Sequence, residues 1–89
     1  MNSPEEIGRL RGELDKLTEK FIELLSVRDK LVMRIGEEKK KSEVQVQDPD
    51  REKDIIERAE KTALEKGVDP AYAKELVELM VRHGRRLQR

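Results

Sequence analysis

Arg28 is the residue of this chain whose position most clearly points to chemistry, because it interrupts an apolar helical stripe. Nine residues follow an alternating spacing of three and four, as on the packing face of a long helix, and eight of them are apolar. The nine are Ile7, Leu10, Leu14, Leu17, Phe21, Leu24, Arg28, Leu31 and Ile35. A guanidinium on a packing face needs an anionic partner, since an unpaired buried charge is costly. Either a carboxylate of the protein or a small anionic ligand supplies it.

Two further cations, Arg11 and Lys39, lie near the same face of this predicted helix. Lys39 follows Arg28 by eleven residues, which is about three turns or roughly 16 Å of rise. Arg11 is about 25 Å from Arg28 along the helix, too far to bind the same small ligand within one chain. Fixed cations of this kind bind carboxylates, and a guanidinium does so through two parallel hydrogen bonds.

Polar residues further along the chain complete the candidate set. Gln88 adds an amide donor to an otherwise apolar helical stripe, and Gly84 leaves space one turn below it. Asp48 and Glu52 lie where a helix is predicted to begin, so backbone N–H groups and a carboxylate could meet a polar group of a ligand there. Gly36 allows the close approach of another backbone, at about 1 kcal/mol relative to alanine.

Each of these residues also has a purely structural interpretation. Arg28 could pair with a glutamate on the stripe and set the register of two helices, and the periodicity alone does not separate this from ligand binding. Lys39 lies in a charged run typical of a solvated helix surface. Asp48 fits a helix N-cap and Glu52 favours the helix dipole. Gln88 could be a frayed polar residue near the end of the chain.

The composition excludes several classes of function. The 20 basic and 20 acidic residues balance, so the net charge indicates neither nucleic acid nor a membrane surface as partner. The chain has no cysteine and a single histidine, which excludes disulfides, thiolate metal sites and a histidine metal centre. It has no apolar run of even ten residues, and its acidic N-terminus is unlike a signal peptide. We therefore expect a cytoplasmic protein that needs no metal.

Three repeated start signals predict three helices. The sequence Ser-Pro-Glu-Glu at residues 3–6 is typical of a cap, a proline at the first helical position and a capping-box glutamate. Asp48-Pro49 and Asp69-Pro70 repeat the cap and the proline. We predict an all-α fold in a single domain over residues 1–89, with one long and two short helices at about residues 4–41, 49–66 and 70–88.

The long helix requires a partner. It would measure roughly 57 Å, and only 35% of the chain is hydrophobic, so two short helices cannot cover its apolar sides. We therefore predict an intertwined homodimer. If two copies pack antiparallel about a two-fold axis near Ile22, the partner's Arg11 arrives between Arg28 and Lys39. Three cations then converge on one pocket, twice per dimer, and would hold an anion.

Together these positions resemble the all-helical class of chorismate mutase over essentially the whole chain. The resemblance rests on Leu10-Arg11, on Leu24-Leu25 followed by Arg28, on Ile35-Gly36 followed by Lys39, on Asp48-Pro49-Asp50-Arg51-Glu52 with Ile55, Ile56, Glu57 and Arg58, and on Gln88. No single element is specific to the family, but the combination of the block at residues 48–52 with the three cations at this distance is specific.

The resemblance implies an isomerase of phenylalanine and tyrosine biosynthesis that converts chorismate to prephenate without a cofactor. It implies an intertwined homodimer with two sites, each built from both chains. Arg28 and the partner's Arg11 would bind the two carboxylates of chorismate. Since the reaction is a unimolecular rearrangement, the protein has to hold a rare conformer and stabilise charge as the C–O bond breaks.

The resemblance also implies roles for the remaining residues. Lys39 would contact a carboxylate and the ether oxygen, and Gln88 would donate to that same oxygen. Glu52 and the backbone at Asp48 would hold the ring hydroxyl. The family often has a small hydroxyl residue where this chain has Gly84, which would leave one carboxylate contact to water or a backbone N–H.

Two other functions remain open from the sequence. An isochorismate–pyruvate lyase on the same scaffold would use much the same cations, because its substrate is also a cyclic dicarboxylate enol-pyruvyl ether. A helical dimerisation module without chemistry would instead predict an internal acidic partner for Arg28.

Overall fold

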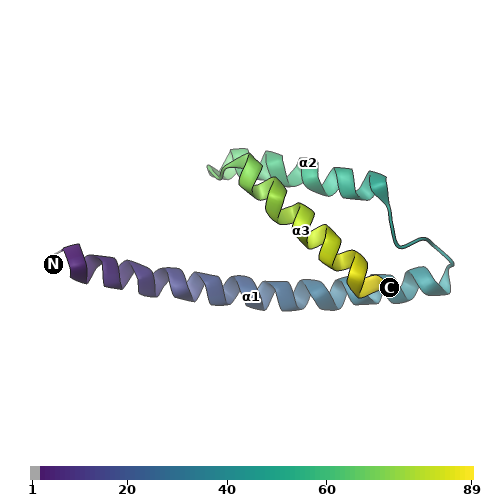
Figure 1. Ribbon diagram of the computed structural model, residues 1–89, viewed down its shortest axis with the longest axis horizontal. Coiled ribbons are helices and arrows are strands. Elements are labelled where there is room, and N and C mark those ends of the chain that lie inside the picture. The colour runs from purple at the N-terminus through teal and green to yellow at the C-terminus, as the bar shows by residue number, and fades with distance from the viewer. Residues whose placement is uncertain (1–2) are drawn as a thin grey trace. The chain divides into compact units, whose positions relative to one another are not determined.

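The computed structural model describes residues 3–89, and these form three α-helices and no strand (Figure 1). They are α1 (Ser3–Lys41), α2 (Pro49–Lys66) and α3 (Pro70–Gln88). The predicted all-α class is confirmed, and α2 and α3 begin at the prolines that follow the two predicted caps. The chain divides into two compact units, one up to Leu31 and the other Val32–Arg89. Each unit is described by itself below.

The first unit consists of the N-terminal part of α1, and its apolar stripe is not covered. Leu14, Leu17 and Leu24 are 60%, 62% and 67% exposed. Short-range contacts support this helical segment: Arg9 pairs with Glu6 and with Glu13, residues one turn away on either side. Such pairs contribute only a few tenths of a kcal/mol each. A helix with a long apolar face gains most of its stability from packing that face against another surface.

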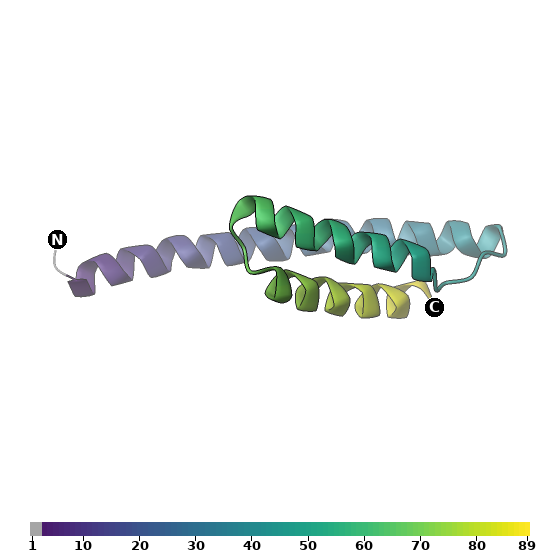
Figure 2. The ribbon, with the colours of Figure 1, turned by 90° about the horizontal axis from the view of Figure 1, so that it is seen from above.

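The second unit begins with the last turns of α1 and continues through α2 and α3. The two shorter helices lie side by side and run antiparallel (Figures 1 and 2). At the start of α2 the Asp48 carboxylate accepts a hydrogen bond from the Arg51 N–H at 3.1 Å, and at the start of α3 that of Asp69 accepts from the Ala71 N–H at 3.0 Å. Both caps satisfy backbone donors that have no partner inside the helix.

Left-handed residues end the first two helices. Gly67 has φ 74° after α2, and the Val68 N–H donates to the Ala63 carbonyl at 2.8 Å. The same closure ends α1, where Glu43 has φ 57° and the Val44 N–H donates to the Lys39 carbonyl at 2.8 Å. Glycine adopts this conformation without strain, whereas glutamate does not. This turn places the following loop against Lys39.

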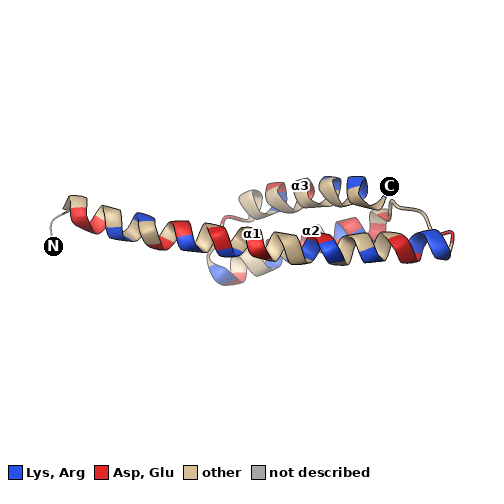
Figure 3. Cartoon of the chain, turned by 90° about the horizontal axis from the view of Figure 1, so that it is seen from below, with Lys and Arg blue, Asp and Glu red and all other residues tan. Residues whose placement is uncertain are grey.

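Charge is distributed evenly over the helices. Figure 3 shows basic and acidic residues interspersed along α1, with no long stretch of one sign. Small residues form the most buried positions of the second unit, namely Gly36, Ala63 and Gly84. Among residues 3–89, no helix is both long enough and apolar enough to cross a membrane. Because the most buried positions hold small residues, residues 3–89 by themselves bury little of their large apolar side chains.

Candidate active site

Lys39 and Gln88, the two residues predicted to share one oxygen of the substrate, are in direct contact. The Lys39 Nζ donates to Gln88 Oε1 at 2.9 Å and to the Val46 carbonyl at 2.9 Å. Both side chains are half-buried. Lys39 is therefore not a freely solvated surface lysine, and Gln88 is not a frayed polar residue. The contact joins the last turns of α1 and α3 across 49 residues of sequence.

Gly36 makes this contact possible. A Cβ at Gly36 would lie 3.1 Å from the Cα and 3.0 Å from the Cγ of Gln88, closer than side chains normally pack. The Gln88 Nε2 also donates to the carbonyl of Val32, which lies one turn before Gly36 on α1, at 3.3 Å. The close backbone approach predicted at Gly36 is confirmed, and the backbone that approaches is the end of α3. A Cβ at Gly84 would be in ordinary contact with Val32 at 3.5 Å, so a small side chain would fit there.

Replacing Gly36 with alanine should separate helix propensity from packing. Alanine favours a helix over glycine by up to about 1 kcal/mol, but crowding Gln88 costs roughly 1–3 kcal/mol. Gly12→Ala is the matched control, because Gly12 is also within α1 and a Cβ there meets nothing within 4 Å. We expect Gly36→Ala to unfold at lower denaturant concentration than Gly12→Ala and to lose activity. Equal stabilisation by both changes would show that the approach at Gly36 is loose.

Glu52 is held by Arg85, a residue that the sequence analysis did not single out. The Arg85 Nε donates to Glu52 Oε2 at 2.9 Å, and its Nη2 donates to Glu52 Oε1. These hydrogen bonds raise the pKa of the Arg85 guanidinium above its ordinary value. Arg85 lies one turn before Gln88 on α3, and this helical spacing is the signal by which it could have been found. Glu52 therefore does more than favour the helix dipole.

Asp48 has the structural role that its sequence context predicts. Its carboxylate caps α2, and its backbone carbonyl accepts a hydrogen bond from the Glu52 N–H at 3.0 Å. The cap thus fixes the first turn of α2 and, with it, the backbone position of Glu52. Its carboxylate is exposed.

Arg11 and Arg28 belong to the first unit. Arg28 is half-buried and Arg11 is exposed. Within residues 3–31, Arg9 forms ion pairs with Glu6 and with Glu13. A guanidinium has five N–H donors with which it can bind an anion.

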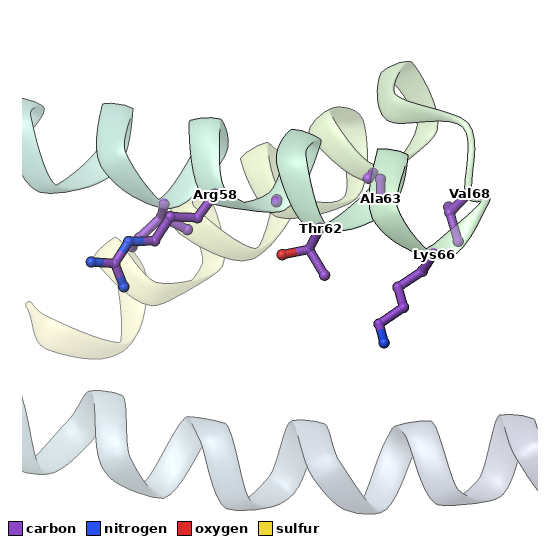
Figure 4. Close-up of a pocket in the computed structure, with 8 residues that line it drawn as sticks. Arg58, Thr62, Ala63, Lys66 and Val68 are labelled. Atoms are coloured by element: carbon purple, nitrogen blue, oxygen red, sulfur yellow. The ribbon is translucent and has the colours of Figure 1, made fainter.

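A hollow of about 440 Å³ lies on α2 and α3, apart from the Lys39–Gln88 contact. It contains none of the residues predicted for the site, and its lining consists of Ile55, Arg58, Ala59, Thr62, Ala63, Lys66, Val68 and Ala73. Figure 4 shows Arg58, Thr62 and Lys66 projecting from one side of α2. Its floor of alanine, isoleucine and valine is suited to covering by apolar side chains. Within residues 3–89, no group of three or more acidic, histidine or cysteine residues could hold a metal ion.

Comparison with known proteins identifies the family. Residues 10–89 match the chorismate mutase type II family. The chain is 27% identical over 85 residues to the chorismate mutase of Methanocaldococcus jannaschii, covering 96% of this chain and 86% of that protein. It is 43% identical over 54 residues to the bifunctional chorismate mutase/prephenate dehydratase of Aquifex aeolicus, covering 61% of this chain and 15% of that protein. The resemblance inferred from the cations and the acidic block is therefore confirmed, and this chain belongs to the chorismate mutase type II family, a family of isomerases.

Proposed function

We propose that this chain, as a single chorismate mutase domain over residues 1–89, converts chorismate to prephenate in the synthesis of phenylalanine and tyrosine. The observation that carries the proposal is the contact between Lys39 and Gln88, with Lys39 Nζ 2.9 Å from Gln88 Oε1. It places the Lys39 ammonium beside the Gln88 amide, whose oxygen accepts from Lys39 and whose Nε2 donates to the Val32 carbonyl, in a chain of this family. A breaking C–O bond needs such donors, because negative charge develops on its oxygen.

Counting donors supports this assignment. An ammonium group has three N–H donors, and Lys39 uses one each for Val46 and Gln88. The Gln88 amide has two, and one of them is directed at the Val32 carbonyl. Each residue thus retains a donor for the ether oxygen. Because their other donors are already fixed to protein atoms, little reorganisation is needed as the charge develops.

The rearrangement itself needs no nucleophile, proton transfer or cofactor. In one step the ether C–O bond breaks and a C–C bond forms within the same molecule. The protein has to bind the chair-like conformer in which the two reacting carbons approach each other. In this proposal Arg28 and the partner's Arg11 bind the two carboxylates, and Glu52 with the backbone at Asp48 binds the ring hydroxyl. Contacts that strengthen as the ether bond breaks raise kcat, whereas uniform contacts only lower KM.

The proposed active form is an intertwined homodimer with two sites. Support comes from the uncovered stripe of α1, where the side chains of Leu14, Leu17 and Leu24 are at least 60% exposed. Burying one such leucine contributes about 1.5–3 kcal/mol, so pairing two stripes is strongly favourable. The hollow on α2 and α3 is a second apolar surface that a partner chain can fill. In this arrangement the partner supplies Arg11.

Product identification tests the proposed reaction. Incubation of the chain with chorismate should remove the absorbance of chorismate and give the NMR signals of prephenate. A parallel incubation with isochorismate addresses the lyase alternative, which would yield pyruvate and salicylate. If neither incubation gives these products and chorismate does not raise the melting temperature of the chain, the dimerisation module is favoured instead.

Gln88→Glu is expected to make the activity depend on pH. Only a protonated carboxyl can donate to the ether oxygen, so kcat/KM should fall about tenfold per pH unit above the pKa of the new carboxyl. Lys39 beside it stabilises the ionised form and lowers that pKa, which moves the active range further towards acid. Initial rates across the acidic to neutral range measure this. Gln47→Glu, in the exposed loop, is the matched control, and a flat profile for Gln88→Glu would argue against Gln88 as donor.

A further inference from the structure

We propose that Arg85 is a positioning residue of the active site, which fixes the Glu52 carboxylate and cancels its negative charge towards a doubly anionic substrate. The inference rests on the proposed function, because it assigns Glu52 to the ring hydroxyl of chorismate. It adds a residue on α3 that acts on the substrate through another side chain.

The geometry is that of a two-pronged clamp between helices. Arg85 on α3 donates through Nε to Glu52 Oε2 at 2.9 Å and through Nη2 to Glu52 Oε1. The side chains of Arg85 and Glu52 are 31% and 19% exposed. By comparison, Arg51 and Arg58 pair with Asp54 on their own helix, and those side chains are 46–74% exposed. The Glu52 pair is therefore better shielded from water and orients both carboxylate oxygens.

The pair lies next to the groups proposed for the ether oxygen. Arg85 and Gln88 are one helical turn apart, at the end of α3. From this turn, Gln88 reaches Lys39 on α1 while Arg85 reaches Glu52 on α2. The last turn of α3 thus connects the residue assigned to the ring hydroxyl with the residues assigned to the breaking bond.

Charge explains why Glu52 needs this partner. A free carboxylate beside a dicarboxylate substrate repels it, and in a partly shielded site this repulsion weakens binding by about tenfold or more. The Arg85 guanidinium removes most of this repulsion. Each carboxylate oxygen accepts one hydrogen bond from Arg85 and retains a second lone pair for a hydroxyl donor. Glu52 can then select a hydroxyl without rejecting the anion.

Replacing Arg85 tests the inference through the division between KM and kcat. Arg85→Met keeps an unbranched apolar stem and removes the guanidinium with its charge, so we expect KM for chorismate to rise about tenfold with a smaller change in kcat. Arg86→Met is the matched control, since Arg86 is the next, exposed residue of α3, and it should behave as wild type. If Arg85→Met does not fold, Arg85→Gln keeps an amide group that can donate to Glu52 without the charge, and it carries the same expectation.

Rescue separates charge cancellation from a merely structural clamp. Glu52→Gln in the Arg85→Met background removes the unbalanced charge and keeps an oxygen for the ring hydroxyl, so KM should return to within about threefold of wild type. An Arg85→Met variant with a lower melting temperature but an unchanged KM would overturn the inference, and so would the absence of rescue by Glu52→Gln. In either case, turnover of chorismate by the wild-type chain would leave the proposed function intact. A wild-type chain that consumes no chorismate would overturn both.

Discussion

Lys39→Ala is expected to lower kcat by at least about a hundredfold, which is the usual effect of removing one hydrogen-bond donor from a developing oxyanion. Lys39 is the cation in contact with Gln88, and it is fixed by the Val46 carbonyl at 2.9 Å. Its remaining donor is therefore held ready for the ether oxygen. Because that oxygen gains charge only as the bond breaks, the loss should fall mainly on kcat. Steady-state rates of chorismate consumption measure both constants.

Lys40→Ala is the matched control for this experiment. Lys40 is the neighbouring residue of α1 and is exposed, so its removal should leave kcat unchanged. Lys39 also binds the loop through Val46, so helix content and oligomeric state should be compared for all three proteins. A Lys39→Ala variant that is folded and turns over at the wild-type rate would remove Lys39 from the catalytic group.

Two inactive variants are expected to restore activity when they are mixed. If each site combines Arg28 of one chain with the partner's Arg11, Arg28→Ala and Arg11→Ala chains together rebuild one intact site per mixed dimer. At equal amounts about half of the dimers are mixed, so about a quarter of all sites become intact. Each variant alone should lose most of its activity, because a fixed guanidinium that selects the reactive conformer is missing. Chorismate consumption after subunit exchange is the measurement.

The control is a mixture that cannot rebuild a site. Arg28→Ala mixed with the Arg11→Ala/Arg28→Ala double variant contains no Arg28 in any dimer and should remain inactive. Native mass spectrometry verifies that chains have exchanged. If mixed dimers form and no activity returns, the two arginines do not serve a shared site. If a monomeric chain is fully active, the homodimer proposal is wrong.

The helices of this protein could be predicted because their signals are local. Asp48-Pro49 and Asp69-Pro70 mark the starts of α2 and α3, since the cap carboxylates bond to N–H groups two or three residues away. The resemblance to the family rested on residue types at set spacings along these helices. Arg28 was informative for the same reason, because one charge in a regular apolar stripe is visible without any structure.

The pairing of side chains between helices could be predicted from the sequence only in part. Gly36 was recognised as a place for close approach, but the sequence did not say that Gln88 approaches it. Arg85 was missed, because a basic residue near the end of an exposed helix is ordinarily solvated. Its spacing from Gln88 indicated the helix face, but its partner Glu52 is 33 residues away, and the sequence does not give the rotation of α3 that brings the two side chains together.

The amino-acid sequence by itself determined the three helices, their ends, the exposed apolar stripe and the set of candidate cations. Each of these depends on interactions within about four residues, or on a periodicity that the backbone geometry dictates. The tertiary structure alone decided that Lys39 contacts Gln88 and that Arg85 clamps Glu52. Such contacts depend on how one helix is rotated and shifted against another, and a change of one residue in register would turn these side chains to a different face.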